Sequence, residues 1–168
     1  TMRGSLLAVT EMPRLPNSTA MLVPIDLNGQ PVLAMISTSS AEVIIDSAGG
    51  RESSWVSVVF DQRVEIKDVP ALSKDLSGIS REVNAPVKVL LGTNMLRHLN
   101  ATFDYLGRQF VVRNYEPPPP PVATRVPLAY IRGGGMVLRS TIGTAAEAPA
   151  FNLFLDSAST FSIALDDQ

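Results

Sequence analysis

One pattern occurs twice in this chain, over residues 21–45 and again over residues 136–165. Each copy has an apolar run, a turn, a second apolar run, a loop rich in small hydroxyl residues, and a third apolar run. In the first copy the turn is Asn28-Gly29, which suits a tight hairpin because both residues tolerate positive φ. Short apolar runs bounded by turn residues are typical of buried β-strands. The repeat therefore predicts one sheet module followed by the opening of a second. The apolar runs are 21–27, 31–36 and 43–45 in the first copy, and 136–138, 151–155 and 161–165 in the second.

Further strand patterns lie between the two copies, at 55–60, 63–67, 69–72, 87–91, 101–105 and 109–112. The first two of these runs partly alternate apolar and polar residues, which predicts an antiparallel pair. Pro70 cannot donate a backbone hydrogen bond, so the strand that contains it is expected at a sheet edge. The one helix that we expect covers residues 94–99, with Thr93 as its N-cap.

Five consecutive prolines at 117–121 separate the two copies of the pattern. Such a run favours the polyproline II conformation and acts as a semi-rigid spacer. It can also bind an aromatic groove, but we favour the spacer interpretation. The sequence predicts four parts. They are an extended N-terminal arm (1–20), a β module (21–115), a proline-rich linker (116–124) and a partial second β module (125–168).

The composition limits the chemistry that the chain can perform. Its 168 residues are 45% hydrophobic and 18% charged, enough apolar content for a core, and the net charge of −2 gives no reason to expect a nucleic acid partner. No apolar run approaches the roughly 18–20 residues that span a bilayer, so no membrane partner is expected. Without cysteine there is no thiolate site, and the lone His98 cannot build a multi-histidine metal site. We therefore expect no cofactor and no metal.

Three elements of the sequence resemble parts of the retropepsin-like and pepsin-like aspartic peptidases. Asp156-Ser157-Ala158 follows an apolar strand and is similar to the Asp-Thr/Ser-Gly signature of that family. Residues 90–96 resemble the element of two hydrophobic residues and a glycine that packs beside the signature loop. Residues 101–112 resemble the closing hairpin of bacterial retropepsin-like modules. The resemblance implies an all-β fold: a closed β-barrel module with one short helix, followed by the start of a second similar module.

The resemblance also implies a mechanism. The family uses two carboxylates about 3 Å apart that share one proton, one acting as base on a water and the other as acid. The second residue of each signature loop supplies a hydroxyl that ties the two loops together, and the third residue is small. The second loop here keeps Asp156, Ser157 and Ala158. The first loop has Ser37, Thr38 and Ser39.

The first loop is therefore degenerate, because Ser37 stands where the family has an aspartate and Ser39 where it has a glycine. Pairing the two loops would place Asp156, the surviving catalytic carboxylate, against Ser37. A serine cannot share a proton with a carboxylate as a second aspartate does, so hydrolysis by the usual route is expected to fail. Gly49 and Gly50 are interpreted as the flap that covers a bound peptide.

Simpler interpretations of these residues stay open. Asp156 suits an ordinary turn after a strand, and Gly49-Gly50 suits a hairpin turn without a flap role. His98 is expected to be a surface or packing residue, and Asp104 to serve the hairpin turn that follows it. The triplet 133–135 is expected to form a loose turn rather than a phosphate site, because no helix pattern follows it.

Two functions are consistent with these residues. The first is an aspartic endopeptidase, incomplete or inactive in this chain, whose second carboxylate would come from Asp156 of another copy in a homodimer or from a missing C-terminal segment. The second is a non-catalytic module that binds an extended peptide or protein. The second copy of the pattern stops soon after Asp156, as in a shortened chain, a cleaved chain, or a segment that completes a neighbouring module. The cell compartment is not determined by the residues; the resemblance suggests a periplasmic or secreted bacterial protein.

Overall fold

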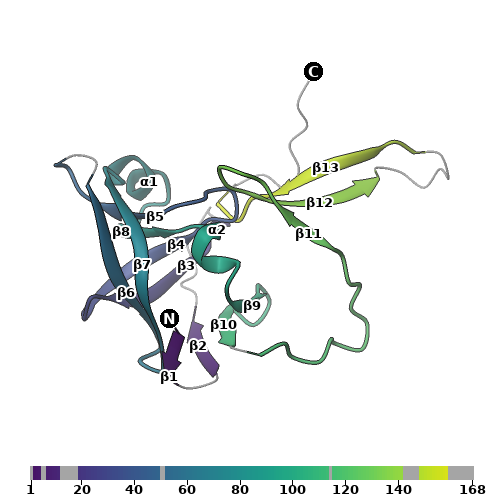
Figure 1. Cartoon of the computed structure of the whole chain (residues 1–168), viewed down its shortest axis with the longest axis horizontal. Helices are drawn as coiled ribbons and strands as arrows, with labels where there is room; N and C mark the ends of the chain where they lie inside the picture. Colours follow the sequence, from purple (N-terminus) through teal and green to yellow (C-terminus); the bar gives the residue numbers. More distant parts are fainter. Residues whose placement is uncertain are drawn as a thin grey trace.

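A computed structural model describes residues 2–4, 7–11, 19–49, 52–113, 115–141 and 148–158 of the chain (Figure 1). Six strands form a closed barrel, since β6 pairs with β3 on one side and with β7 on the other. The order around the barrel is β7, β5, β8, β4, β3 and β6. These strands are β3 (Leu22–Leu27), β4 (Gln30–Ile36), β5 (Val43–Asp46), β6 (Ser53–Phe60), β7 (Val64–Lys74) and β8 (Val87–Leu91). The predicted all-β class is confirmed.

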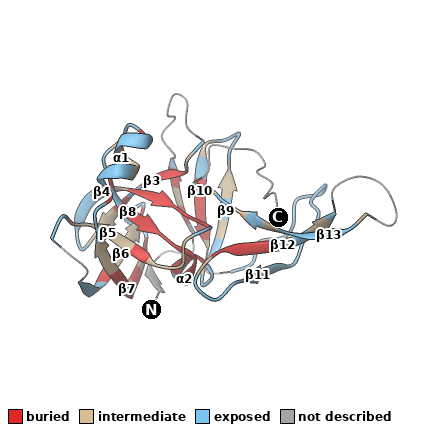
Figure 2. Cartoon of the chain, turned by 90° about the horizontal axis from the view of Figure 1, so that it is seen from above, coloured by how far each residue is buried: buried red, intermediate tan, exposed pale blue. Residues whose placement is uncertain are grey.

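The barrel core is formed by the side chains that alternate inward along these strands. Val56, Val58 and Phe60 of β6 are buried, while the residues between them are more exposed. This period of two is the signature of a strand with one face on a core. Figure 2 shows the buried residues concentrated in the barrel strands and in β10. The tight turn between β3 and β4 has positive φ at both Asn28 and Gly29, as the sequence predicted.

Two additional strands come from the N-terminal part of the chain. β1 (Met2–Gly4) pairs antiparallel with the start of β7, and β2 (Leu7–Glu11) pairs antiparallel with β10. β2, β10 (Gln109–Arg113) and β9 (Asn100–Asp104) form a three-stranded sheet in that order. Within the predicted extended arm (1–20), residues 2–4 and 7–11 therefore take part in two sheets.

The run that contains Pro70 is not a separate edge strand, as the sequence predicted, but the second half of β7. β7 pairs with β6 along one side, with Pro70 opposite Trp55. On the other side, β1 pairs only as far as Ile66 and β5 pairs only from Ala71 onward. Pro70 thus lies in a gap between two neighbours, where its missing N–H breaks no ladder.

The prediction of one helix was wrong, because the described residues form two. α1 (Ser77–Glu82) was not predicted; it has no fully buried residue and begins without a side-chain cap. α2 (Thr93–Leu96) overlaps the predicted helix 94–99 at residues 94–96 and ends before residue 97. Its N-cap is Gly92 rather than Thr93, and Thr93 is instead buried in the first turn.

Beyond the proline run, a further sheet extends from the barrel; it is called the second sheet because it contains strands of the second copy of the repeat (Figure 1). Its order is β11 (Leu128–Tyr130), β12 (Met136–Thr141) and β13 (Ala150–Leu155), all antiparallel. β12 and β13 match predicted strands, whereas β11 was not predicted. Most of the predicted turn at 143–149 and the predicted strand at 161–165 lie outside the described residues. The predicted domain boundaries, and the similarity of this sheet to the first module, remain predictions.

Candidate functional site

The first hydroxyl-rich loop joins β4 to β5 and is held by the start of α2. The carbonyl of Ser40 accepts a hydrogen bond from the N–H of Thr93 at 2.8 Å, and the carbonyl of Ala41 accepts one from Asn94 at 2.9 Å. These N–H groups have no partner inside the helix, because they belong to its first turn. The approach is so close that a Cβ on Gly92 would lie 2.6 Å from the Ala41 carbonyl oxygen. The glycine that the sequence places before α2 thus lets the helix hold the loop.

The second loop follows β13 and is joined to the first through Thr38 and Ser157. The Thr38 N–H donates to the Ser157 Oγ at 3.0 Å, and the Ser157 N–H donates to the Thr38 Oγ1 at 2.9 Å. Each hydroxyl in turn donates to a carbonyl of the opposite strand: Thr38 to Leu155, and Ser157 to Ile36. Four hydrogen bonds therefore connect the two loops in a reciprocal arrangement.

Asp156 lies beside this connection, on the exposed side of the loop. Its Oδ1 accepts a hydrogen bond from the Ser39 Oγ at 2.9 Å and another from the Ala158 N–H at 2.9 Å. The Ser39 Oγ lies 3.3 Å from the Ser37 Oγ. Ser37 is only 1% exposed, and its Oγ also accepts from the Ser40 N–H at 3.2 Å. The structure thus brings together all six positions named from the two loops.

The immediate partners of Asp156 are therefore hydroxyl and amide groups. No hydrogen bond of Asp156 in the described part of the chain leads to another carboxylate. The arrangement can orient a polar group or a water, but it holds one acid–base group and not two.

The glycine triplet at 133–135 packs directly on the first loop. All three glycines have positive φ, and the neighbouring Met136 N–H donates to the Thr38 carbonyl at 2.9 Å. A Cβ on Gly134 would lie 2.4 Å from the backbone nitrogen of Ala41. The predicted loose turn is thus a close backbone contact that only glycine permits.

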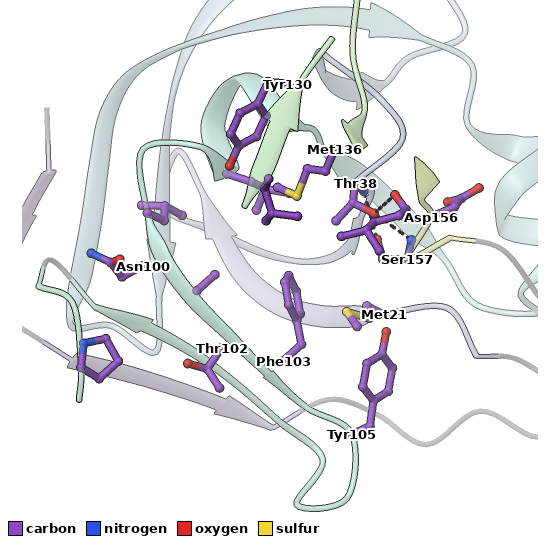
Figure 3. A pocket seen from close by; sticks show the side chains of 16 residues that line it. Met21, Thr38, Asn100, Thr102, Phe103, Tyr105, Tyr130, Met136, Asp156 and Ser157 are labelled. Carbon is purple, nitrogen blue, oxygen red and sulfur yellow. Dashed lines mark hydrogen bonds between the residues drawn. The ribbon is translucent and has the colours of Figure 1, made fainter. Parts of the chain in front are cut away.

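A cavity of about 460 Å³ lies next to the paired loops (Figure 3). Thr38 and Ser157 contribute to one end, Phe103 and Tyr105 come from the β9 hairpin, and Tyr130 comes from β11. Burial raises the pKa of the Tyr105 hydroxyl above its usual value. Sequence reasoning missed this cavity, because its walls come from segments that are remote in the chain. The full lining is Met21, Thr38, Leu96, Leu99, Asn100, Ala101, Thr102, Phe103, Tyr105, Pro117, Leu128, Tyr130, Met136, Leu155, Asp156 and Ser157.

Gly49 of the predicted flap does not line this cavity. Gly49 is exposed in the turn after β5, and Gly50 lies outside the described residues. The Gly49 N–H donates to the Ser47 Oγ at 3.3 Å, a contact within the turn. A flap role for Gly49 and Gly50 stays a prediction.

The remaining candidate residues have local roles. The Asp104 Oδ1 accepts the Gly107 N–H at 2.7 Å, so the prediction that Asp104 serves its hairpin turn is confirmed. His98 is exposed and accepts a hydrogen bond from the neighbouring Arg97. Over the described residues, no group of three or more His, Cys, Asp or Glu side chains could hold a metal ion. In the same residues, no helix has the length and apolar character needed to cross a membrane.

Comparisons with known proteins found similarity to solved structures. No family model matches the sequence, and no curated protein matches it either. Among solved structures, the chain is similar to a retropepsin-like aspartic protease from Rickettsia conorii, with 11% sequence identity and a TM-score of 0.44. The similarity covers 67% of this chain and 92% of that protein.

Proposed function

We propose that this chain is an aspartic-peptidase-like module that does not hydrolyse peptide bonds by itself. The observation that carries the proposal is the environment of Asp156. The loop paired with it presents serines, and Ser39 donates to Asp156, the one carboxylate that the described residues bring to the site. Hydrolysis through an activated water needs a second group that protonates the substrate during the reaction. A serine hydroxyl does not supply that proton near neutral or acid pH.

The paired loops support the assignment to this class of module. Thr38 and Ser157 exchange hydrogen bonds reciprocally, as expected where two signature loops of the family meet. The second position of each loop keeps its hydroxyl, whereas the first position of one loop has lost its carboxylate. The framework that positions a catalytic pair is therefore retained, and one member of the pair is missing.

The test is peptide cleavage between about pH 3 and pH 8, measured with a mixed peptide library by mass spectrometry. The unmodified chain and Asp156→Asn should give the same background. Cleavage by the unmodified chain that disappears in Asp156→Asn would contradict the proposal. It would mean that Asp156 finds a second carboxylate outside this chain, for instance in another copy.

A gain-of-function variant makes the test stricter. Ser37→Asp combined with Ser39→Gly restores the residue types of the family at the first loop and removes the hydroxyl that occupies Asp156. We expect cleavage with an acid pH optimum in this variant, and its loss when Asp156→Asn is added. A matched control is Ser40→Asp with Ser39→Gly, which adds the carboxylate three positions beyond residue 37 in the same loop.

The cavity beside the loops favours a second function, that of a module that binds a peptide or a protein without cutting it. Its volume of about 460 Å³ is within the range of ligand sites. It is lined mainly by apolar side chains, with a few polar groups at one end. A binding role requires neither a second carboxylate nor a change at Ser37.

A further inference from the structure

The cavity in Figure 3 follows the free edge of strand β9. β9 ends its sheet, and within the described residues its one strand partner is β10. The four consecutive residues Asn100, Ala101, Thr102 and Phe103 all line the cavity. Successive side chains of a strand point to opposite faces, so a cavity on one face would be lined by every second residue. A cavity lined by every residue in turn lies along the backbone edge, where unpaired N–H and C=O groups point outward.

The wall opposite β9 is apolar and belongs to the second sheet. Tyr130 and Leu128 come from β11, Met136 from β12 and Leu155 from β13. Paired residues of neighbouring antiparallel strands share a face, and Tyr130 pairs with Met136, which pairs with Leu155. These side chains thus form a continuous surface. Leu128 is 45% exposed and Tyr130 is 44% exposed, so much of this surface is available to a partner.

The cavity carries little charge. Asp156 is the single charged residue of its lining. The carboxylate of Asp156 binds Ser39 and Ala158, which do not line the cavity. The groups that remain for an occupant are a strand edge, apolar side chains and the side-chain amide of Asn100, since the Thr102 Oγ1 already accepts a hydrogen bond from Arg113. The polar groups of the edge require hydrogen-bond partners, which a purely apolar small molecule cannot supply.

We propose that this cavity binds an extended segment of a partner protein, which adds as a strand to the free edge of β9. Backbone hydrogen bonds to β9 hold the segment, and its uncharged apolar side chains pack against the exposed Tyr130 and Leu128. This mode of binding combines backbone pairing for affinity with side-chain pockets for specificity. The inference rests on the binding function proposed above, and it places the peptide along β9 instead of beneath the predicted flap.

The probe is a phage-displayed library of random linear peptides, selected on the full chain. An enriched peptide is then synthesised with a fluorescent label, and its dissociation constant is measured by anisotropy. We expect enriched peptides with apolar, uncharged centres. Tyr130→Asp should weaken binding by about tenfold or more, which corresponds to roughly 1.4 kcal/mol. Trp55→Ala is the matched control, because Trp55 is 72% exposed but does not line the cavity.

Two proline variants test the strand edge itself. Along β9, the N–H groups of successive residues point alternately toward β10 and toward the free edge. Proline removes the N–H of its residue. One of the two variants Ala101→Pro and Thr102→Pro therefore loses a hydrogen bond to β10, and the other loses a donor at the free edge. The variant that keeps the urea midpoint of the unmodified chain should lose peptide binding. If neither proline variant folds, the peptide affinities of Tyr130→Asp and Leu128→Asp, which are at exposed positions, test whether the peptide binds in the cavity.

Several results would overturn the inference. One is a selection that enriches no peptide, and another is an enriched peptide whose affinity is unchanged in Tyr130→Asp and Leu128→Asp. A concentration-dependent dimer that Tyr130→Asp dissociates would identify a second copy as the occupant instead. Loss of binding in the cavity variants concerns this inference, whereas the cleavage assays concern the missing carboxylate.

Discussion

Replacing Thr38 with valine tests whether the two loops are held together mainly by their hydroxyl groups. Valine has nearly the shape of threonine but lacks the oxygen. In the structure that oxygen accepts the Ser157 N–H at 2.9 Å and donates to the Leu155 carbonyl. Thr38 is 5% exposed, so water cannot easily replace either partner. The variant leaves two polar backbone groups of the second loop without their partners.

The expected cost follows from these two bonds. A typical intramolecular hydrogen bond contributes about 1 kcal/mol net, so the loss of two lowers the stability of this contact by about 2 kcal/mol. The loss should appear first where the second sheet joins the barrel, because that is where the bonds lie. A change of about 2 kcal/mol raises the population of the locally open state roughly 30-fold.

Hydrogen–deuterium exchange measured by mass spectrometry can resolve this effect along the chain. Peptides that cover β12 and β13 should exchange faster in Thr38→Val, while those that cover β6 and β7 should change little. The matched control is Thr10→Val. Thr10 is 6% exposed, and its hydroxyl has no hydrogen-bond partner among the described residues. This control should be neutral or up to about 1 kcal/mol more stable, because it removes a buried hydroxyl that has no hydrogen bond to offset the cost of its burial.

Exchange of β12 and β13 within twofold of the unmodified chain in Thr38→Val would refute the reasoning. It would mean that apolar packing, and not the reciprocal hydrogen bonds, holds the second sheet to the barrel. Equal acceleration in Thr10→Val would refute it as well, since the effect would then belong to threonine-to-valine changes in general.

Three further predictions concern stability. The Lys88 ammonium lies 2.7 Å from Asp46 and lowers the pKa of that carboxyl below its ordinary value of 3.8. The stabilising effect of the Asp46 carboxylate is therefore present above pH 3.8 and is lost as the pH falls through the lowered pKa. Acid unfolding followed by circular dichroism should be less steep in Asp46→Asn below about pH 4. Gly92→Ala should lower the free energy of unfolding in urea by about 1–3 kcal/mol, because the added Cβ would lie 2.3 Å from the backbone oxygen of Glu42 and no side-chain rotation relieves it; an unchanged urea midpoint would contradict this. Gly134→Ala should weaken the contact with the first loop by about 2 kcal/mol, from its φ of +117° and its close approach, and faster exchange of the first loop would verify it.

The sequence alone determined the features that depend on neighbouring residues. Asn28-Gly29 forms its turn because both residues accept positive φ, and Asp104 serves its hairpin because its side chain reaches the backbone three residues on. The barrel strands follow their apolar runs closely, since each run has a core face to bury. The hydroxyl residues Thr38 and Ser157 could be selected from two similar loops before any contact between them was known.

The features that the sequence did not determine depend on segments far apart in the chain. α1 has no fully buried residue and therefore no strong apolar period to reveal it. Pro70 is accommodated inside a paired strand because β1 stops and β5 starts on either side of it, which only the sheet order decides.

The candidate site shows the same division. The sequence indicated which residue types stand in the two loops, with an aspartate first in one and a serine first in the other. The partners of Asp156, the close approach of Gly134 to Ala41, and the cavity along β9 were decided by the tertiary structure alone. Hydrogen bonds and packing act over a few ångströms in space, and the fold sets which distant residues come within that range.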